Sequence, residues 1–268
     1  MSRVRPSLGQ HFLADTNMQR RIVDAARLDP DDHVLEVGPG QGALTQHVAG
    51  RVRRLTLVEL DDALARDLEE QFRDRPDVEV IHRDILQVPL ADVEPEPARL
   101  KVLGNLPYGI TAPLLFHLLS PPAPSEILVM IQKEVADRLS ATPGHGDYGA
   151  LTVGVRTVAQ VERVLRVPRT VFRPPPRVES AVVRITPLQP PPLDPTEVVA
   201  VRRVTRALFQ WRRKQLRRIL RSQPDLALGT EGADRVLWDL ELSPTARPQE
   251  LSPETFVRMA RHPALGGG

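Results

Sequence analysis

The sequence lacks cysteine and is poor in aromatic residues, which make up 4% of its 268 residues. Without cysteine it has no disulfides, thiolate metal sites or cysteine nucleophiles. Its seven histidines are scattered, with no HExxH motif and no close pair, so no metal is expected. No apolar run approaches the roughly 18 residues that a membrane helix needs, and the N-terminus has no apolar signal-peptide core. We therefore expect a cytoplasmic protein with no membrane partner.

The composition indicates a soluble globular enzyme of one large or two unequal domains. Hydrophobic residues make up 41% of the chain and charged residues 26%, with a formal net charge of +2. The charge is uneven, because residues 202–221 contain eight arginines, one lysine and no acidic residue. A basic segment of this kind indicates an anionic partner such as RNA.

Short apolar runs alternate with amphipathic stretches over the first half of the chain, which is typical of βαβ units. The fold class is therefore predicted to be α/β, a doubly wound and mostly parallel sheet. Residues 63–73 and 133–139 have the periodicity of crossover helices, and the runs at 158–167 and 178–185 are predicted to close the sheet, one of them antiparallel. The predicted parallel strands are Val34–Val37, Leu55–Val58, Val78–Ile81, Leu100–Leu103 and Ile127–Ile131.

A proline-rich stretch, PLQPPPLDP at 187–195, blocks helix and central strand and is predicted to be a linker. The predicted domains are residues 1–186, which would bind the cofactor, and residues 196–268. In the second domain Val204, Leu208 and Trp211 recur at helical spacing. Ser252 followed by Pro253 is a helix start signal, so the small C-terminal domain is predicted to be helical.

The first predicted strand runs directly into a glycine-rich turn, EVGPGQGALT at 36–45, that opens a helix. Backbone can approach a ligand closely at Gly38 and Gly40. Taken alone, the turn is ambiguous. It also matches the fingerprint of dinucleotide-binding proteins, and a tight turn without a ligand is the other interpretation.

Carboxylates follow the next two strands. Glu59 ends the second strand, where it could accept both hydroxyl protons of a ribose, although a solvated strand-end charge is the alternative. Asp84 follows the third strand and could accept a hydrogen bond from an adenine amine. Because the carboxyl ends of parallel strands share one edge, the three loops together favour an adenosine-containing cofactor.

The fourth strand ends in Asn105-Leu106-Pro107-Tyr108, which favours a methyl donor over a dinucleotide. Adenine N6 is a poor nucleophile because its lone pair is delocalised, and acceptors for both N–H groups weaken that conjugation. The Asn105 side-chain oxygen and the Leu106 carbonyl are such acceptors, Pro107 fixes the turn, and Tyr108 offers a ring to an extruded base. An ordinary turn with a buried tyrosine is the alternative interpretation.

With these motifs in place, the chain resembles the KsgA/RsmA family of rRNA adenine dimethyltransferases over nearly its whole length. The motifs that carry the resemblance are GQHFL at 9–13, EVGPGQGALT at 36–45, ELD at 59–61, DIL at 84–86, NLPY at 105–108, QKEVA at 132–136, YGAL at 148–151, FRPPPRVESAVVR at 172–184 and RRK at 212–214.

The resemblance implies a Rossmann-like class I methyltransferase that uses S-adenosyl-L-methionine and releases S-adenosyl-L-homocysteine. It implies transfer of two methyl groups to N6 of each of two adjacent adenosines in the loop of the 3′-terminal hairpin of 16S rRNA. That substrate would lie within the immature small ribosomal subunit, and a monomer is expected. The cofactor contacts it implies are Gln10, His11, Leu13, Gly38, Gly40, Glu59, Asp84, Ile85 and Asn105.

Two residues need separate comment, one of the cofactor contacts and one candidate for the base-binding site. The family often has asparagine where this chain has His11, so a backbone contact is expected there. Phe172 is a candidate for the second face of the base sandwich, with a core aromatic at the sheet edge as the alternative.

The basic segment is predicted to be an RNA-binding helix. Arg213, Arg217 and Arg221 would form one cationic stripe at four-residue spacing, and a merely solvated basic face is the alternative. The residues expected to bind RNA are Arg212, Arg213, Lys214, Arg217 and Arg221.

Three rival functions remain open. A large-subunit rRNA adenine methyltransferase of the macrolide-resistance type shares the Asn-Leu-Pro-Tyr chemistry. A ribosome-assembly factor would mainly occupy the immature small subunit, with methylation as a release signal. An NAD-dependent dehydrogenase would instead bind nicotinamide.

Overall fold

A computed structural model describes residues 11–106 and 109–266 of the chain. The chain divides into two compact units, the first comprising residues up to 136 with 161–187, and the second residues 137–160 with those from 188 onward. This division differs from the predicted domains because residues 137–160 join the helical unit. There Tyr148 and Val153 share a buried core with Val204 and Leu208. The proline-rich linker at 187–195 stays a prediction.

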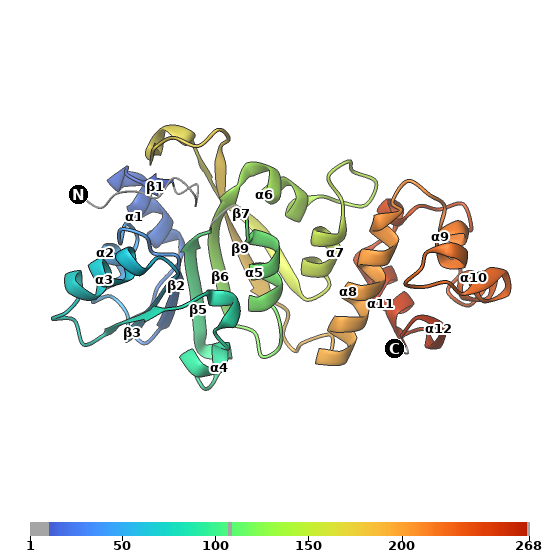
Figure 1. Cartoon of the computed structure of the whole chain (residues 1–268), viewed down its shortest axis with the longest axis horizontal. Coiled ribbons are helices and arrows are strands. Elements are labelled where there is room, and N and C mark those ends of the chain that lie inside the picture. Colours follow the sequence, from blue (N-terminus) through green and yellow to red (C-terminus); the bar gives the residue numbers. More distant parts are fainter. Residues whose placement is uncertain (1–10, 107–108, 267–268) are drawn as a thin grey trace. The chain divides into compact units, whose positions relative to one another are not determined.

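The first unit is built on a sheet which, among the described residues, has seven strands in the order β4-β3-β2-β5-β6-β9-β7 (Figure 1). Neighbouring strands from β4 through β6 are parallel, whereas β9 is antiparallel to β6. The predicted α/β fold is confirmed, including its antiparallel closing strand. The strands are β2 (His33–Val37), β3 (Arg54–Glu59), β4 (Val78–His82), β5 (Leu100–Asn105), β6 (Glu126–Gln132), β7 (Ala159–Val167) and β9 (Ser180–Pro187), with a separate ribbon of β1 (Phe12–Leu13) and β8 (Phe172–Arg173).

Helices connect the parallel strands, and capping side chains start two of them. The Asp15 carboxylate accepts from the Met18 amide at 2.7 Å to begin α1, and Asp61 does the same for α3. The helices before residue 160 are α1 (Thr16–Ala25), α2 (Thr45–Val48), α3 (Asp62–Gln71), α4 (Leu90–Val93), α5 (Thr111–Leu118), α6 (Lys133–Ser140) and α7 (Ala150–Arg156), of which α7 and most of α6 belong to the second unit. Short 3-10 turns lie at η2 (Ile85–Gln87), η3 (Pro97–Arg99) and η4 (Arg169–Val171).

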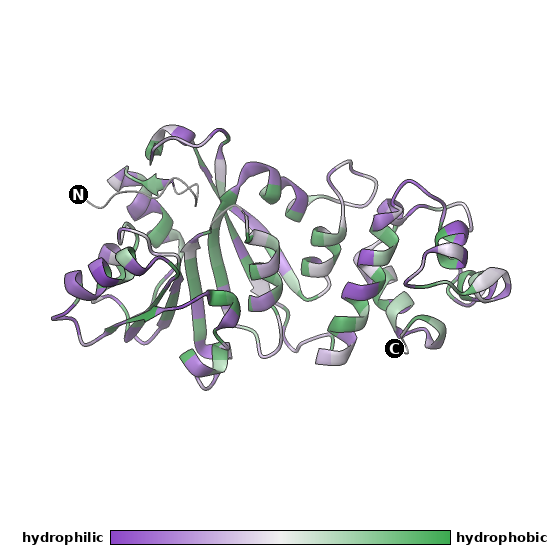
Figure 2. Cartoon of the chain, in the orientation of Figure 1, coloured by the Kyte–Doolittle hydropathy of each residue, from purple (hydrophilic) through white to green (hydrophobic). Residues whose placement is uncertain are grey.

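The central strands are hydrophobic along most of their length, as expected for a sheet with helices on both faces (Figure 2). Every residue of β2 is buried. Beside it on β5, Gly104 pairs with Val37. A Cβ atom on Gly104 would lie 2.6 Å from the Val37 carbonyl oxygen, so the two strands pass at a distance that only glycine allows.

Gly104→Ala is therefore expected to destabilise the protein by about 1–3 kcal/mol, because the added methyl group forces the two strands apart. Urea unfolding of the purified variant measures the change. Gly146→Ala is the matched control, since no atom lies within 4 Å of a Cβ at that position. An equal free energy of unfolding for the two variants would contradict the close approach.

The second unit is helical in its C-terminal part, as predicted. The Asp194 carboxylate caps α8 in a reciprocal arrangement with Glu197, and the Ser252 side chain caps α11 ahead of Pro253, which confirms that predicted helix start. Its helices are α8 (Pro195–Gln210), α9 (Leu216–Ser222), α10 (Gly229–Asp239), α11 (Pro253–Arg261) and α12 (Pro263–Gly266), with a 3-10 turn at η5 (Pro248–Glu250).

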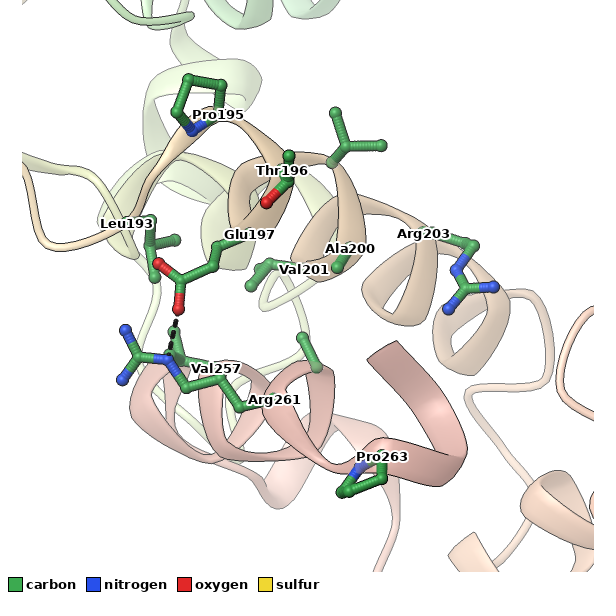
Figure 3. Close-up of a pocket in the computed structure, with 12 residues that line it drawn as sticks. Leu193, Pro195, Thr196, Glu197, Ala200, Val201, Arg203, Val257, Arg261 and Pro263 are labelled. Carbon is green, nitrogen blue, oxygen red and sulfur yellow. Dashed lines mark hydrogen bonds and ion pairs between the residues drawn. The ribbon is translucent and has the colours of Figure 1, made fainter. Parts of the chain in front are cut away.

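A mostly apolar groove of about 800 Å³ lies between α8 and α11, and Glu197 and Arg261 form an ion pair across it at 2.7 Å (Figure 3). Val199 beside it is exposed. Within residues 11–106 and 109–266, none of the helices combines the length and apolar character that crossing a bilayer requires.

Candidate active site

The glycine-rich turn follows β2 at the carboxyl edge of the sheet. Gly38, Gly40 and Gly42 all have positive φ angles, of 64°, 60° and 77°, which side chains rarely adopt. The Gly38 amide donates to the Val58 carbonyl at 2.9 Å and so ties the turn to the end of β3. At three positions the turn thus has backbone without a side chain, at the place where parallel sheets bind ligands.

Glu59 ends β3 and holds this turn. The residue is 5% exposed, and its carboxylate accepts hydrogen bonds from the amides of Gly40 at 3.0 Å, Leu60 at 2.9 Å and Asp61 at 3.0 Å. Backbone amides therefore fix the orientation of the carboxylate. The alternative of a solvated strand-end charge does not fit a side chain that is buried and bonded in this way.

A second acid, Glu36, lies beneath the turn at the end of β2 and is also buried. Burial raises the pKa of the Glu36 carboxyl to about 7, and the nearby Glu59 carboxylate adds to the rise, although the Thr45 hydroxyl donates a hydrogen bond to Glu36 at 2.7 Å. Sequence reasoning gave Glu36 no role of its own. The available signal was an acidic residue inside an otherwise apolar strand.

Glu36→Gln is expected to change how stability depends on pH. Between pH 4.5 and about 7 the folded protein keeps the Glu36 proton that the unfolded chain has lost, so the wild type loses up to about 3 kcal/mol as pH rises through that range. Glutamine does not titrate and still accepts from Thr45. Urea unfolding at pH 5 and pH 8.5 should show the variant gaining stability relative to the wild type at the higher pH. A constant difference at both pH values would contradict the raised pKa.

Asp84 and Ile85 follow β4, the strand next to β3. The Arg83 amide donates to the Glu59 carbonyl at 3.0 Å, which brings this loop to the end of β3. The Asp84 carboxylate caps the short η2 helix by accepting from the Leu86 amide at 3.0 Å, and Ile85 is buried. Asp84 is half-buried, and the contact of its carboxylate with adenine stays a prediction.

Asn105 ends β5, and its side-chain amide is oriented by His11, the residue before β1. The Nδ2 atom donates to the His11 carbonyl at 3.3 Å, which directs the amide oxygen away from that carbonyl. Among the described residues, no hydrogen bond is formed by the Asn105 Oδ1 atom. The next residue, Leu106, is buried and donates its amide to the Met130 carbonyl at 3.0 Å. The two residues that carry the predicted acceptors are therefore each held by a hydrogen bond, Asn105 through its side chain and Leu106 through its backbone amide.

The ribbon of β1 and β8 positions the remaining predicted residues. The His11 side chain is bonded to the Pro174 carbonyl at 2.8 Å, and the expected backbone contact of this residue with the cofactor stays a prediction. Leu13 is buried and pairs with Phe172. Phe172 has no exposed surface and belongs to the core around α1, so its position favours the core-aromatic alternative over base stacking.

Contacts link these strand-end loops in one series. Bonds join the end of β5 to the residue before β1 through Asn105, the turn to β3 through Glu59, and β3 to the loop after β4 through the amide of Arg83. A Cβ atom on Gly40 would lie 3.2 Å from the Phe12 ring, so β1 also contacts the turn. Gln10, Pro107 and Tyr108, which were predicted to contribute, lie outside the described residues.

The prediction of one continuous basic helix is wrong. The helix α8 ends at Gln210, and α9 begins at Leu216 after an extended Gln215. The Leu216 amide bonds to the carbonyl of Ala246 in the loop after α10, which fixes this break. Arg213 therefore lies in the connecting turn, and the three-residue stripe on one helix does not form.

The basic residues also differ in their partners. Two guanidinium nitrogens of Arg217 donate to the Asp234 carboxylate, each at 2.7 Å. Arg212 donates to the Gly146 carbonyl at 3.0 Å. Arg213 and Lys214 are exposed, and in the described part of the chain no acidic side chain pairs with them. The same part of the chain holds no group of three metal-ligating side chains.

Solved structures define the class of protein. A dimethyladenosine transferase from Plasmodium falciparum matches with a TM-score of 0.81 and 24% identity, over 93% of this chain and 96% of that one. The 23S rRNA methyltransferase ErmE matches with a TM-score of 0.67 and 30% identity, over 96% of this chain and 100% of that one. The fold and the site at the ends of the strands are together those of an S-adenosylmethionine-dependent methyltransferase.

Within this class, a family model described as ribosomal RNA adenine dimethylase matches residues 1–230, and the chain belongs to that family. A ribosomal RNA small subunit methyltransferase A from Geobacter metallireducens is 41% identical over an alignment of 269 positions, which covers 99% of this chain and 98% of that protein. One from Pseudomonas aeruginosa is 39% identical over 259 residues, 96% and 94% of the two chains. The predicted family, enzyme class and cofactor are confirmed.

Proposed function

We propose that this enzyme dimethylates N6 of two adjacent adenosines in the loop of the 3′-terminal hairpin of 16S rRNA. The observation that carries the proposal is the Asn105 amide, whose nitrogen is held by the His11 carbonyl at 3.3 Å and whose oxygen is left for a ligand. Relatives named for the small subunit, at 39–41% identity, support this substrate over the large-subunit alternative, whose representative is 30% identical.

The donor and acceptor groups on the strand ends fit S-adenosylmethionine. The open glycine turn would hold the amino-acid end, Glu59 the ribose hydroxyls, and Asp84 with Ile85 the adenine. The Glu59 carboxylate needs no rearrangement for this, since three backbone amides already orient it. When bound, this cofactor supplies an electrophilic methyl group on a sulfonium.

The target adenine is activated by hydrogen bonding rather than by a strong base. The Asn105 oxygen and the Leu106 carbonyl would accept from the two N6–H groups, which localises the lone pair on nitrogen and directs it. The orientation of the Asn105 amide is fixed before the base arrives, because its nitrogen is bonded to the His11 carbonyl. Tyr108 is the proposed stacking platform, and the buried Phe172 is expected to support the site from the core.

We further propose that the enzyme acts as a monomer in the cytoplasm, on an immature small subunit. Arg213, Lys214 and Arg221 are exposed and would contact rRNA phosphates. Arg217, which is paired with Asp234, and Arg212, which is bonded to backbone, would contribute less.

The test is methyl transfer to small subunits that lack these modifications. Radiolabelled S-adenosylmethionine, nuclease digestion and mass analysis of the adenosines should reveal dimethyladenosine at two neighbouring positions, four methyl groups in all. Subunits already methylated are the control and should take up no label. Label on large-subunit rRNA, or a single modified adenosine, would overturn the proposal.

A further inference from the structure

Gln19 of α1 is a polar side chain in an otherwise apolar core, and both ends of its amide are bonded. The side chain is 5% exposed. Its Nε2 donates to the Leu13 carbonyl at 2.8 Å, while its Oε1 accepts from the His47 Nε2 at 3.1 Å and the Gln46 Nε2 at 3.3 Å. A buried amide is tolerated only when it is satisfied, so these bonds fix its geometry.

The donor end of this amide holds β1, a strand of only two residues. The bonded carbonyl belongs to Leu13, and two residues earlier the His11 carbonyl orients Asn105 at 3.3 Å. Between them, Phe12 contacts the glycine turn, since a Cβ atom on Gly40 would lie 3.2 Å from its ring. So short a strand depends on such side-chain bonds for its position.

The acceptor end holds the start of α2, which continues directly from the glycine turn. Gln46 bonds to the amide oxygen and to the Ala43 carbonyl, each at 3.3 Å, and the Gln46 backbone amide donates to the Gly42 carbonyl at 3.1 Å. The two ends of one side chain therefore reach the two backbone segments that are proposed to flank the cofactor.

We infer that Gln19 is a positioning residue that sets the spacing between β1 and the glycine turn, and thereby the affinity for S-adenosylmethionine. The inference rests on the proposed cofactor site. Glutamine is required because one group must donate on one side and accept on the other at the same time. Glutamate has only acceptors when ionised, and leucine has neither function.

The experiment is calorimetric binding of S-adenosylhomocysteine, with steady-state kinetics on unmethylated small subunits. Gln19→Leu should raise the Kd for S-adenosylhomocysteine and the KM for S-adenosylmethionine about tenfold, with kcat within about threefold. Gln19→Glu should weaken binding similarly, because it keeps the acceptor for His47 but cannot donate to the Leu13 carbonyl. His47→Ala should have a smaller effect, since Gln46 still bonds to the amide oxygen.

Ile22→Val is the matched control, because it removes one buried methyl group from the same helix and leaves the hydrogen bonds of Gln19 in place. It should lower the Tm but leave the Kd unchanged. If Gln19→Leu also lowers only the Tm and keeps the wild-type Kd, the residue is merely structural and the inference is overturned. Failure of the wild type itself to bind S-adenosylhomocysteine would overturn the proposed cofactor site, and this inference with it.

Discussion

Asn105→Ala is expected to lower the rate of methyl transfer about 10²–10³-fold, the loss typical of removing one group that stabilises developing charge. Alanine removes the acceptor for the adenine N6–H and also the bond to the His11 carbonyl at 3.3 Å. Binding to unmethylated small subunits should change by no more than a few-fold, because phosphate contacts dominate that affinity. Single-turnover kinetics and filter binding measure the two quantities separately.

The matched variant is Asn105→Asp, which keeps an oxygen acceptor but cannot donate to the His11 carbonyl. Its rate should lie between those of the wild type and Asn105→Ala. If Asn105→Ala keeps a rate within threefold of the wild type, acceptance by this amide is not what activates the adenine. Equal losses of binding and turnover would instead favour a protein whose main task is to occupy the subunit.

Glu59→Ala is expected to weaken S-adenosylhomocysteine binding about a hundredfold. Two charge-assisted hydrogen bonds to the ribose are lost, each worth roughly 1.5 kcal/mol or more. The three backbone amides that the carboxylate orders, of Gly40, Leu60 and Asp61, also lose their acceptor. Titration calorimetry below the unfolding transition measures the affinity.

Asp62→Asn is the control for charge alone, because it removes an exposed carboxylate three residues further along the chain. The affinity of the Asp62→Asn protein for S-adenosylhomocysteine should stay within about threefold of the wild-type value. A Glu59→Ala protein that is folded and binds as tightly as the wild type would show that the ribose is held elsewhere.

The parallel sheet and most of the site edge could be predicted because both follow from strong local rules. Apolar runs such as Ile127–Ile131 are long enough to be buried strands, and β6 spans Glu126–Gln132. Carboxyl ends of parallel strands share an edge, so Glu59 and Asn105 were expected near the glycine turn. Glu59 accepts a hydrogen bond from the Gly40 amide of that turn, whereas the bond of Asn105 goes to the His11 carbonyl.

What could not be predicted depends on contacts between distant segments. The bonds of Gln19 to Leu13 and His47 have no signal in sequence spacing, and a glutamine on a helix is ordinarily solvated. Phe172 is buried because β8 pairs with β1, a pairing across about 160 residues. The break before Leu216 likewise arises from a bond to Ala246, whereas the run of arginines by itself suggested one continuous helix.

The most direct test of the account is the structure of this enzyme bound to S-adenosylhomocysteine and an RNA hairpin that carries the target adenosines. The account predicts an unstacked adenine whose N6 lies about 3 Å from both the Asn105 Oδ1 atom and the Leu106 carbonyl oxygen. A bound adenine elsewhere, or an Asn105 amide turned so that its oxygen faces away from N6, would contradict it.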